Sequence, residues 1–405
     1  MSNDASLLKR GLFQLRHKTS RFLAAVNLAS PLWDNLSGQK HGLIIIDGLF
    51  PNLISAFRIA EINSILDYFD TAVAYGASSS WRVFRKYSAA YPQFASRVRP
   101  FHPFRTLRGS GAYVIFLNPV HMYLNYLEKA HLPFVFELYP GGGFCLNHPV
   151  SDAHLRRVVG SPMFRRVIVT QTVTRDYLIH NKFCREDQIE FIYGVVVPSD
   201  RFSEIGGQAA LYGTAKNTFD ICFVAYKYTP RGIDKGYDRF VECARILSKR
   251  RSQIRFHVVG NFTEADIDVS DLCGRITFYG PQLMPFFPAF YSRMDLIISP
   301  NVPYLLAPGA FDGFPTACCI EAALCGVAMF VTDPLGLNEG RLKHGEDVVI
   351  VSPEPEDIAT AVEEYLADPA RLVRLAKSGQ QAMRKLFAFD TQMAPRLRVL
   401  SDLLS

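Results

Sequence analysis

Short apolar runs alternate with amphipathic stretches along the first half of the chain. The runs predict strands over residues 42–47, 71–75, 112–117, 133–139, 166–170 and 189–193, with helices over 55–68, 122–130 and 174–180. Within 55–68, for example, apolar residues recur at the spacing of one helical face. Strands and helices in alternation are typical of a parallel sheet with crossover helices.

A second alternating series follows residues 194–218, which carry no strong periodicity and which we interpret as a linker. Its predicted strands are 219–226, 254–259, 276–279, 296–298, 327–331 and 348–351, and its helices are 237–250, 316–325, 355–366, 370–386 and 391–404. We therefore predict an α/β protein with two Rossmann-like, doubly wound domains that face each other across a cleft. The first domain takes residues 1–205 and a C-terminal crossover helix, 387–405, and the second takes 206–386. Ligands of such folds bind at the carboxyl ends of the strands.

Composition agrees with a globular protein of two domains. The chain has 405 residues, of which 49% are hydrophobic and 20% are charged, a balance that excludes disorder. No apolar run reaches the roughly 18–20 residues of a membrane span, and the N-terminus lacks the pattern of a signal peptide, so we expect a cytoplasmic protein. The eight cysteines are scattered without a Cys-x-x-Cys pair, which argues against a disulfide framework and a zinc site. We expect no metal.

The net charge of +6 is unevenly distributed. Five basic residues lie among leucines in the first 21 residues: Lys9, Arg10, Arg16, Lys18 and Arg21. Two interpretations remain open, namely a helix in peripheral contact with an anionic inner membrane, or a solvated N-terminal helix. A second basic run contains Arg97, Arg99, Arg105 and Arg108. No nucleic-acid motif accompanies it, so an anionic acceptor or a lipid surface is the better hypothesis for this run than nucleic acid.

Residues 307–326 contain the most informative motif of the chain. Asp312, the turn Gly313-Phe314-Pro315 and Glu321 lie across a loop that enters a predicted helix, between two predicted strands. A helix that begins at the end of a strand offers free backbone N–H groups and a positive dipole end, which suit a phosphate. Carboxylates beside it would serve hydroxyl groups. The motif therefore predicts a site for a nucleotide sugar.

Seven segments between Phe219 and about Ala382 resemble, in order, the donor domain of retaining glycosyltransferases of the GT-B fold, especially family 4. The segments are 223–226 with 234–236, 256–260, 276–280, 290–300, 307–326, 331–336 and 345–350. The resemblance implies that Lys235, which precedes a glycine, binds the diphosphate, whose leaving group gains negative charge in the transition state. The family's Gly-Arg pair is replaced here by Ala-Tyr, and Lys227 and Arg231 are the candidates for a second cation.

The same resemblance assigns the carboxylates and the loop. Glu321 matches the glutamate that accepts hydrogen bonds from the ribose. Asp312 takes the place of the earlier glutamate beside the donor sugar, but eight residues, not seven, separate it from Glu321. The loop of residues 313–316 should wrap the sugar, with Thr316 as N-cap of the helix. Two glycines that end predicted strands, Gly260 and Gly280, complete the donor-binding set.

The first half resembles the family less. Residues 137–144 stand where many members carry a histidine near the end of the middle strand, and they contain Gly141, Gly142 and Gly143. Three glycines after a strand permit a close approach of the backbone to a ligand. Glu137 or Tyr139 is a candidate to orient or deprotonate an acceptor hydroxyl. The other interpretation is a glycine turn beside a core glutamate whose hydrogen bonds are satisfied.

The resemblance implies a glycosyltransferase of hexosyltransferase type. It would use a nucleotide-diphosphate sugar as co-substrate, need no metal, and transfer the sugar with retention to a glycan or lipid-linked acceptor. Bacterial surface polysaccharide, such as O-antigen, capsule or lipopolysaccharide, is the expected product. Two alternatives remain: a nucleotide-sugar epimerase or phosphorylase of the same architecture, although the cofactor-lysine motif of a phosphorylase is missing, and a non-catalytic scaffold that binds sugars or a partner.

Overall fold

The computed structural model describes residues 41–77, 80–102, 106–205, 210–214 and 216–405. The basic N-terminal stretch, Arg105 and the glycines at 206 and 207 lie outside this part. Contacts divide the chain into two compact units. Unit 1 comprises the described part of Met1–Leu138, His154–Ile168 and Leu397–Ser405, and unit 2 comprises Tyr139–Ala153 and Val169–Arg396. The predicted domain boundary between residues 205 and 206 stays a prediction.

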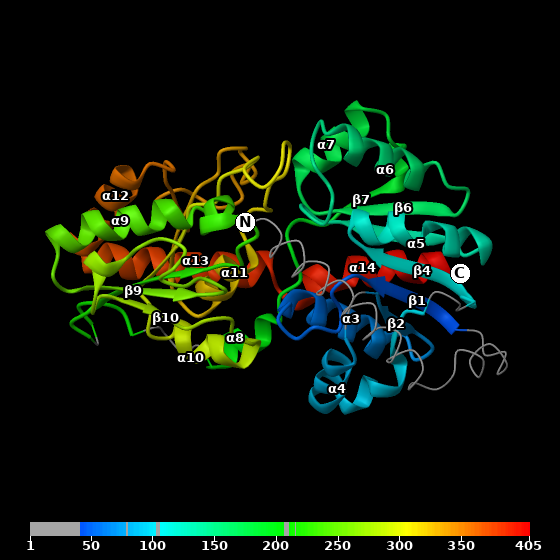
Figure 1. Cartoon of the computed structure of the whole chain (residues 1–405), viewed down its shortest axis with the longest axis horizontal. Coiled ribbons are helices and arrows are strands. Elements are labelled where there is room, and N and C mark those ends of the chain that lie inside the picture. The colour runs from blue at the N-terminus through cyan, green and yellow to red at the C-terminus, as the bar shows by residue number, and fades with distance from the viewer. Residues whose placement is uncertain (1–40, 78–79, 103–105, 206–209, 215) are drawn as a thin grey trace, which may run out of the picture. The chain divides into compact units, whose positions relative to one another are not determined.

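The first sheet has seven strands in the order β3-β2-β1-β4-β5-β6-β7 (Figure 1). The strands are β1 (His41–Asp47), β2 (Val73–Gly76), β3 (Val98–Pro100), β4 (Gly109–Ile115), β5 (Phe134–Leu138), β6 (Phe164–Val169) and β7 (Ile189–Phe191). The helices in this half are α3 (Ala56–Tyr68), α4 (Trp81–Ala90), α5 (Leu117–Lys129), α6 (Pro149–Val159), α7 (Thr172–His180) and α8 (Ser199–Ile205). Strands β1 to β5 pair in parallel. The four residues of β1 from Leu43 to Ile46 are fully buried, as expected for a strand covered on both faces.

The second sheet has six strands in the order β10-β9-β8-β11-β12-β13, all paired in parallel. The strands are β8 (Phe219–Val224), β9 (Ile254–Val259), β10 (Ile276–Phe278), β11 (Leu296–Ser299), β12 (Ala328–Val331) and β13 (Val349–Ile350). The helices are α9 (Tyr237–Arg250), α10 (Phe287–Tyr291), α11 (Ala317–Leu324), α12 (Pro355–Ala367), α13 (Pro369–Leu386) and α14 (Phe389–Leu404). Two parallel sheets confirm the predicted α/β class.

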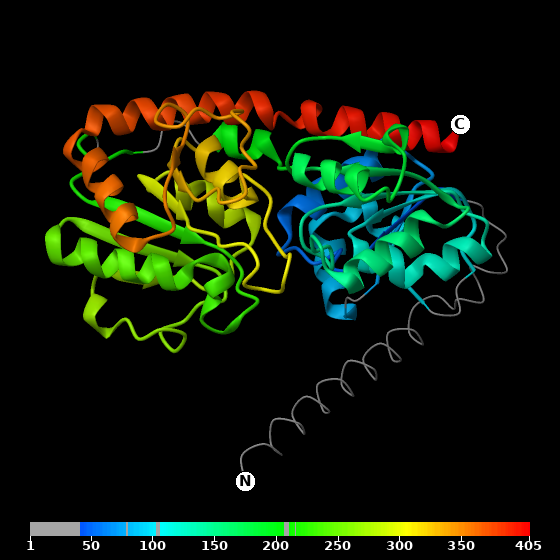
Figure 2. The ribbon, with the colours of Figure 1, turned by 90° about the horizontal axis from the view of Figure 1, so that it is seen from above.

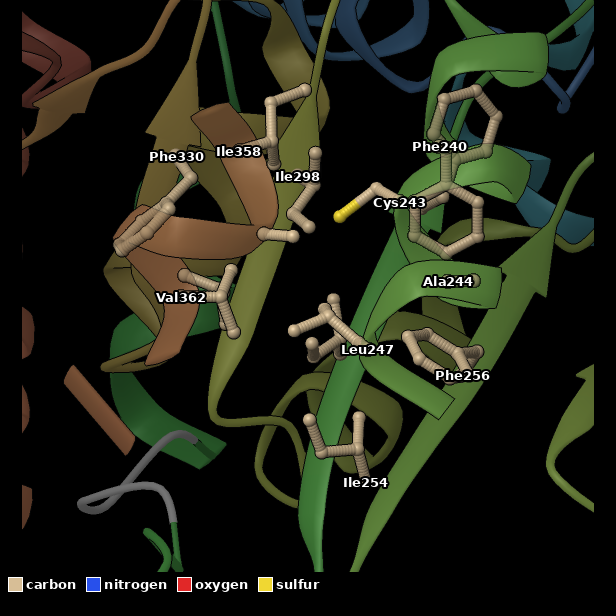
Figure 3. Packing of buried hydrophobic residues seen from close by; sticks show 14 of the residues in the cluster. Phe240, Cys243, Ala244, Leu247, Ile254, Phe256, Ile298, Phe330, Ile358 and Val362 are labelled. Carbon is tan, nitrogen blue, oxygen red and sulfur yellow. The ribbon is translucent and has the colours of Figure 1, made fainter. Parts of the chain in front are cut away.

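Helices cover both faces of the second sheet. Figure 2 shows the green α9 and the orange-red α13 on opposite sides of its strands. On α9, Phe240, Ala244 and Leu247 recur at helical spacing and are fully buried. Figure 3 shows them packed with strand residues such as Ile298 and with Val362 of α12. Because each buried Phe or Leu side chain contributes about 1.5–3 kcal/mol, this cluster holds the strand ends in place.

The start of α5 differs from the prediction. Residues 112–117 were expected to form a strand and a helix to begin at 122, but β4 ends at Ile115 and α5 begins at Leu117. Phe116 between them has a φ of 74°, which turns the chain directly from strand into helix. The apolar run continues through this turn, so hydrophobic periodicity cannot separate the two elements.

Four helices were missed, namely α4, α6, α8 and the five-residue α10. The segment interpreted as a linker, 194–218, contains α8, which has seven residues and is too short to show a helical period. Helix α4 buries only Phe84 and Tyr87, so its apolar face is narrow, and α6 was not predicted either. Within the part of the chain that the structure describes, no helix has the length and hydrophobicity needed to cross a membrane.

Candidate functional site

A pocket in unit 2 lies at the carboxyl ends of β11 and β12. Its walls come from three segments: 299–303 after β11, 311–316 with Cys319 at the start of α11, and residues between 331 and 337 after β12. The predicted loop residues Asp312, Gly313, Phe314, Pro315 and Thr316 all line this pocket. Parallel strands open a crevice at this end of a sheet, which is where ligands of such folds bind.

Lys235 contacts Asp312 of the pocket wall from a different segment of the chain, although Lys235 itself does not line the pocket. Its Nζ lies 2.7 Å from both Oδ1 and Oδ2 of Asp312, and only 13% of the lysine side chain is exposed. Burial lowers the pKa of Lys235, but the Asp312 carboxylate outweighs it and holds this pKa above its usual value. The two residues are 77 positions apart in the sequence. The structure therefore brings the predicted phosphate ligand and the predicted sugar ligand into direct contact.

Gly236 explains why Lys235 is followed by glycine. Gly236 precedes α9 with a φ of 69°, a conformation that favours glycine. A Cβ at this position would lie 1.9 Å from the carbonyl oxygen of Pro300. Only glycine allows the backbone at the start of α9 to approach the end of β11 so closely, and this approach places Lys235 beside the pocket.

Asn301 fixes the position of Asp312. Its Nδ2 donates a hydrogen bond of 2.7 Å to Asp312 Oδ2, while its Oδ1 accepts one of 3.1 Å from the Ser299 hydroxyl. The Thr332 hydroxyl donates a 2.6 Å bond to the backbone carbonyl of Asn301. The sequence interpretation missed Asn301, although a polar residue directly after a buried strand is a signal for the ligand-binding edge of a sheet.

The two candidates for a second cation have different environments. Lys227 forms an ion pair with Asp266 and packs near the Phe262 ring, so its charge is already compensated. Arg231 is exposed, with a φ of 61°, and makes no hydrogen bond or ion pair within the described residues. Arg231 is therefore the candidate whose charge is available to a ligand.

Gly260 and Gly280 lie together at the ends of β9 and β10. The Gly260 N–H donates a 3.1 Å hydrogen bond to the Gly280 carbonyl. Gly260 has a φ of 136°, and a Cβ there would lie 1.8 Å from the carbonyl oxygen of Ala225. Neither glycine lines the pocket. Close packing against Ala225 therefore explains the glycine at position 260. The ligand-binding role of Gly260 and Gly280 stays a prediction.

Gln171 holds the loop of residues 313–316. Its side-chain amide donates to the Phe314 carbonyl and accepts from the Phe314 N–H, both at 3.4 Å, and Gln171 is buried. Thr316 is the N-cap residue of α11, but its hydroxyl does not cap the helix. It lies 3.2 Å from Cys318 Sγ and 3.3 Å from Cys319 Sγ instead. The first-turn N–H groups of α11 thus have no side-chain cap.

Glu321 projects from the middle of α11. It is 7% exposed, and in the described part of the chain its carboxyl group has no hydrogen-bond partner. Burial, with a smaller effect of Cys318, raises the pKa of Glu321 to about 8. A carboxyl group on a side chain that is only 7% exposed and makes no hydrogen bond to the described residues is a candidate acceptor for ligand hydroxyls.

The residues predicted for the acceptor side have protein partners. Glu137 on β5 is fully buried, and the Tyr113 hydroxyl contacts both its carboxyl group and, at 2.5 Å, that of Glu61. The Tyr139 hydroxyl accepts a 3.2 Å bond from the buried Arg396. These contacts fit the interpretation of Glu137 as a core residue, and its catalytic role stays a prediction.

The glycines Gly141, Gly142 and Gly143 all have positive φ values, of 83°, 57° and 96°. The Phe144 N–H closes a turn on the Gly141 carbonyl at 3.0 Å. A Cβ on Gly141 would meet no atom within 4 Å, so open space adjoins this position. The positive φ, and not a close contact, therefore explains why residue 141 is a glycine. The close approach of a ligand to this loop stays a prediction.

Comparisons with known proteins support the predicted resemblance. Residues 219–368 match the family model described as Glycosyl transferases group 1. A search of curated protein sequences found no match. Among solved structures, HepE from Anabaena in complex with UDP-glucose shares 18% identity, covers 89% of this chain and 100% of its own, and has a TM-score of 0.66.

Two further structures extend over the same length. A glycosyltransferase from Rickettsia africae ESF-5 shares 14% identity over 91% of this chain and 99% of its own, with a TM-score of 0.65. Sucrose-phosphate synthase from Thermosynechococcus elongatus shares 13% identity over 90% of this chain and 99% of its own, with a TM-score of 0.59. At these identities the likeness shows the fold. Residues 219–368 therefore carry the domain of the Glycosyl transferases group 1 family, and the chain has the two-sheet fold of GT-B glycosyltransferases.

Proposed function

We propose that this protein transfers a sugar from a nucleotide-diphosphate sugar to a glycan or lipid-linked acceptor. The observation that carries the proposal is the contact of Lys235 with Asp312, which lines a pocket at the strand ends, with Glu321 on the adjoining helix α11. The family match of residues 219–368 and the UDP-glucose bound by HepE support the same chemistry.

In this proposal, each group of the site meets one part of the donor. Lys235 and the unpaired Arg231 stabilise the diphosphate as negative charge develops on it. The uncapped N–H groups of α11 add a second set of donors for phosphate. Glu321 accepts hydrogen bonds from the ribose hydroxyls, and Asp312 accepts them from the sugar.

We further propose transfer with retention and without a metal ion. Fixed cations at the diphosphate supply the charge stabilisation that a metal would otherwise give, and the departing phosphate takes the proton of the acceptor hydroxyl on the same face of the sugar. A bacterial surface polysaccharide is the proposed product. The proposed location is the cytoplasmic face of the membrane, and the support for it is the basic composition of residues 1–21, which lie outside the described residues.

A thermal-shift screen against UDP, GDP and ADP and their sugar conjugates tests the proposal. A ligand that binds only the folded state raises its melting temperature, so at least one nucleotide sugar should do so. The stabilising donor is then assayed for release of nucleoside diphosphate in the presence of candidate acceptors, and the anomeric configuration of the product is read by NMR. No stabilisation by any nucleotide would contradict the proposed function and favour a non-catalytic scaffold.

A further inference from the structure

The contact between Lys235 and Asp312 resembles the contact that a donor phosphate would make. Both carboxylate oxygens lie 2.7 Å from the lysine nitrogen, and the two side chains are 13% and 35% exposed. An anionic group with two oxygens on one ammonium is also what a phosphate would present. Asp312 therefore occupies the place on Lys235 that a diphosphate would need.

A phosphate can bind Lys235 only by displacing or crowding this carboxylate. Two negative groups on one ammonium repel each other, so the phosphate must move the Asp312 carboxylate away from Lys235. The lost ion pair reduces the net free energy that any diphosphate gains by binding to Lys235. The loss is offset when the displaced carboxylate gains new hydrogen-bond donors. Sugar hydroxyls on an intact donor can supply them, whereas a nucleoside diphosphate has no sugar there. The competition therefore weakens binding of the diphosphate product more than binding of the donor.

We propose that Asp312 is a specificity-determining residue that competes with phosphate for Lys235 and so makes the site prefer the intact nucleotide sugar over the nucleoside diphosphate. This inference rests on the proposed donor site and extends it to product release. After transfer, the sugar hydroxyls leave with the product, and Asp312 pairs again with Lys235 as the diphosphate departs.

Asn301 is the positioning residue in this scheme. Its amide holds Asp312 Oδ2 at 2.7 Å, and the Ser299 hydroxyl on Asn301 Oδ1 keeps that amide in the donating orientation. Asp312 released from Lys235 keeps this bond and stays at the pocket wall, where sugar hydroxyls can reach it. Asn301 also lines the pocket, so it acts at the site and not from a distant core.

Isothermal titration calorimetry with UDP, GDP and ADP and their glucose or mannose conjugates tests the proposal. The wild type should bind the matching conjugate at least about tenfold more tightly than the bare diphosphate, the scale of one hydrogen bond to a charged group. In Asp312→Asn, the diphosphate should bind about tenfold more tightly than in the wild type, and the preference for the conjugate should fall towards one. Asp312→Glu keeps the charge and should retain the preference.

An unchanged preference in Asp312→Asn, or equal weakening of both ligands, overturns this inference and leaves the proposed function standing. If the wild type binds none of these ligands, both the inference and the proposed function are overturned.

Asn301→Ala provides a second readout that a merely structural role would not give. This substitution should lower the affinity for the conjugate several-fold and leave the affinity for the diphosphate within about twofold of the wild type, because Asp312 still pairs with Lys235. Asn125→Ala, on helix α5, is the matched control and should change neither affinity. Equal weakening of both ligands in Asn301→Ala contradicts the positioning role.

Discussion

Glu137 and Glu321 are both buried glutamates on regular elements, but their surroundings differ. The Glu137 carboxyl group, on β5 of the first sheet, shares the Tyr113 hydroxyl with Glu61 of helix α3. The Glu321 carboxyl group has no partner among the described residues, and burial raises its pKa to about 8. A buried acid that already holds hydrogen bonds stabilises the fold, whereas one without them costs stability until a ligand supplies them. The comparison therefore separates a structural carboxyl group from a binding one.

The largest expected effect follows from substitution of Lys235, the cation that contacts the pocket wall. Lys235→Met removes the charge that stabilises the leaving diphosphate, so the transfer rate should fall about 100- to 1,000-fold. A steady-state assay of nucleoside diphosphate release measures it. Lys249→Met, on an exposed turn of α9, makes the same change of charge away from the site and should leave the rate unaltered. Wild-type turnover in Lys235→Met would contradict the assignment of the donor diphosphate to Lys235.

Substitution of the two glutamates tests the comparison itself. Glu321→Ala should weaken nucleotide binding about tenfold or more, because two ribose hydroxyls lose the carboxyl group that accepts their hydrogen bonds. Glu137→Gln should leave nucleotide affinity within about twofold. Calorimetry on both variants gives the contrast, and the reverse order of effects would invalidate the assignment of Glu321 to the ribose.

Glu137→Gln should instead lower the free energy of unfolding by about 1–3 kcal/mol, because it disturbs a buried hydrogen-bond network. Thermal melting measures this change. If transfer is lost while stability and donor affinity are unchanged, Glu137 acts on the acceptor, and the structural interpretation is wrong.

The pH dependence of stability should also differ. Glu321 has a folded-state pKa of about 8 against an ordinary value of 4.5, so the folded state keeps a proton that the unfolded state loses. The contribution of Glu321 to the free energy of unfolding should therefore fall as pH rises from about 4.5 to about 8, and level off above. Glu321→Gln removes this contribution, so the variant should gain stability relative to the wild type across that range. Melting curves at several pH values measure the difference, and parallel profiles would contradict the raised pKa.

The smallest effect distinguishes the two candidate cations. Arg231→Met should weaken nucleotide binding by up to about fivefold, as expected for one exposed charge. Lys227→Met should change the affinity less, because Lys227 is already paired with Asp266. Equal losses in both variants would mean that a ligand draws Lys227 away from Asp266.

Sequence patterns predicted most of the strands because each one is a short, buried apolar run, as in Leu43–Ile46. They failed where an apolar run continues from β4 into α5 through Phe116, and where α8 is too short to show a period. Local sequence cannot reveal such a change of direction inside one apolar run.

The candidate site was predictable only residue by residue. Lys235, Asp312 and Glu321 follow from the family resemblance, but the direct pairing of Lys235 with Asp312 does not. Asn301 was missed although its place after a buried strand is a signal, and Gln171 was missed because it acts through a tertiary contact. Gln171, for example, holds Phe314 across 143 positions of sequence, and no pattern in one chain shows this.

A crystal structure with the nucleotide sugar that stabilises the protein most would show whether the donor binds at Lys235 and Glu321. We predict a donor phosphate within hydrogen-bond distance of Lys235 Nζ, ribose hydroxyls on the Glu321 carboxylate, and Asp312 separated from Lys235. A bound nucleotide sugar elsewhere, with Lys235 and Asp312 still paired and Glu321 without a ligand, would contradict the account.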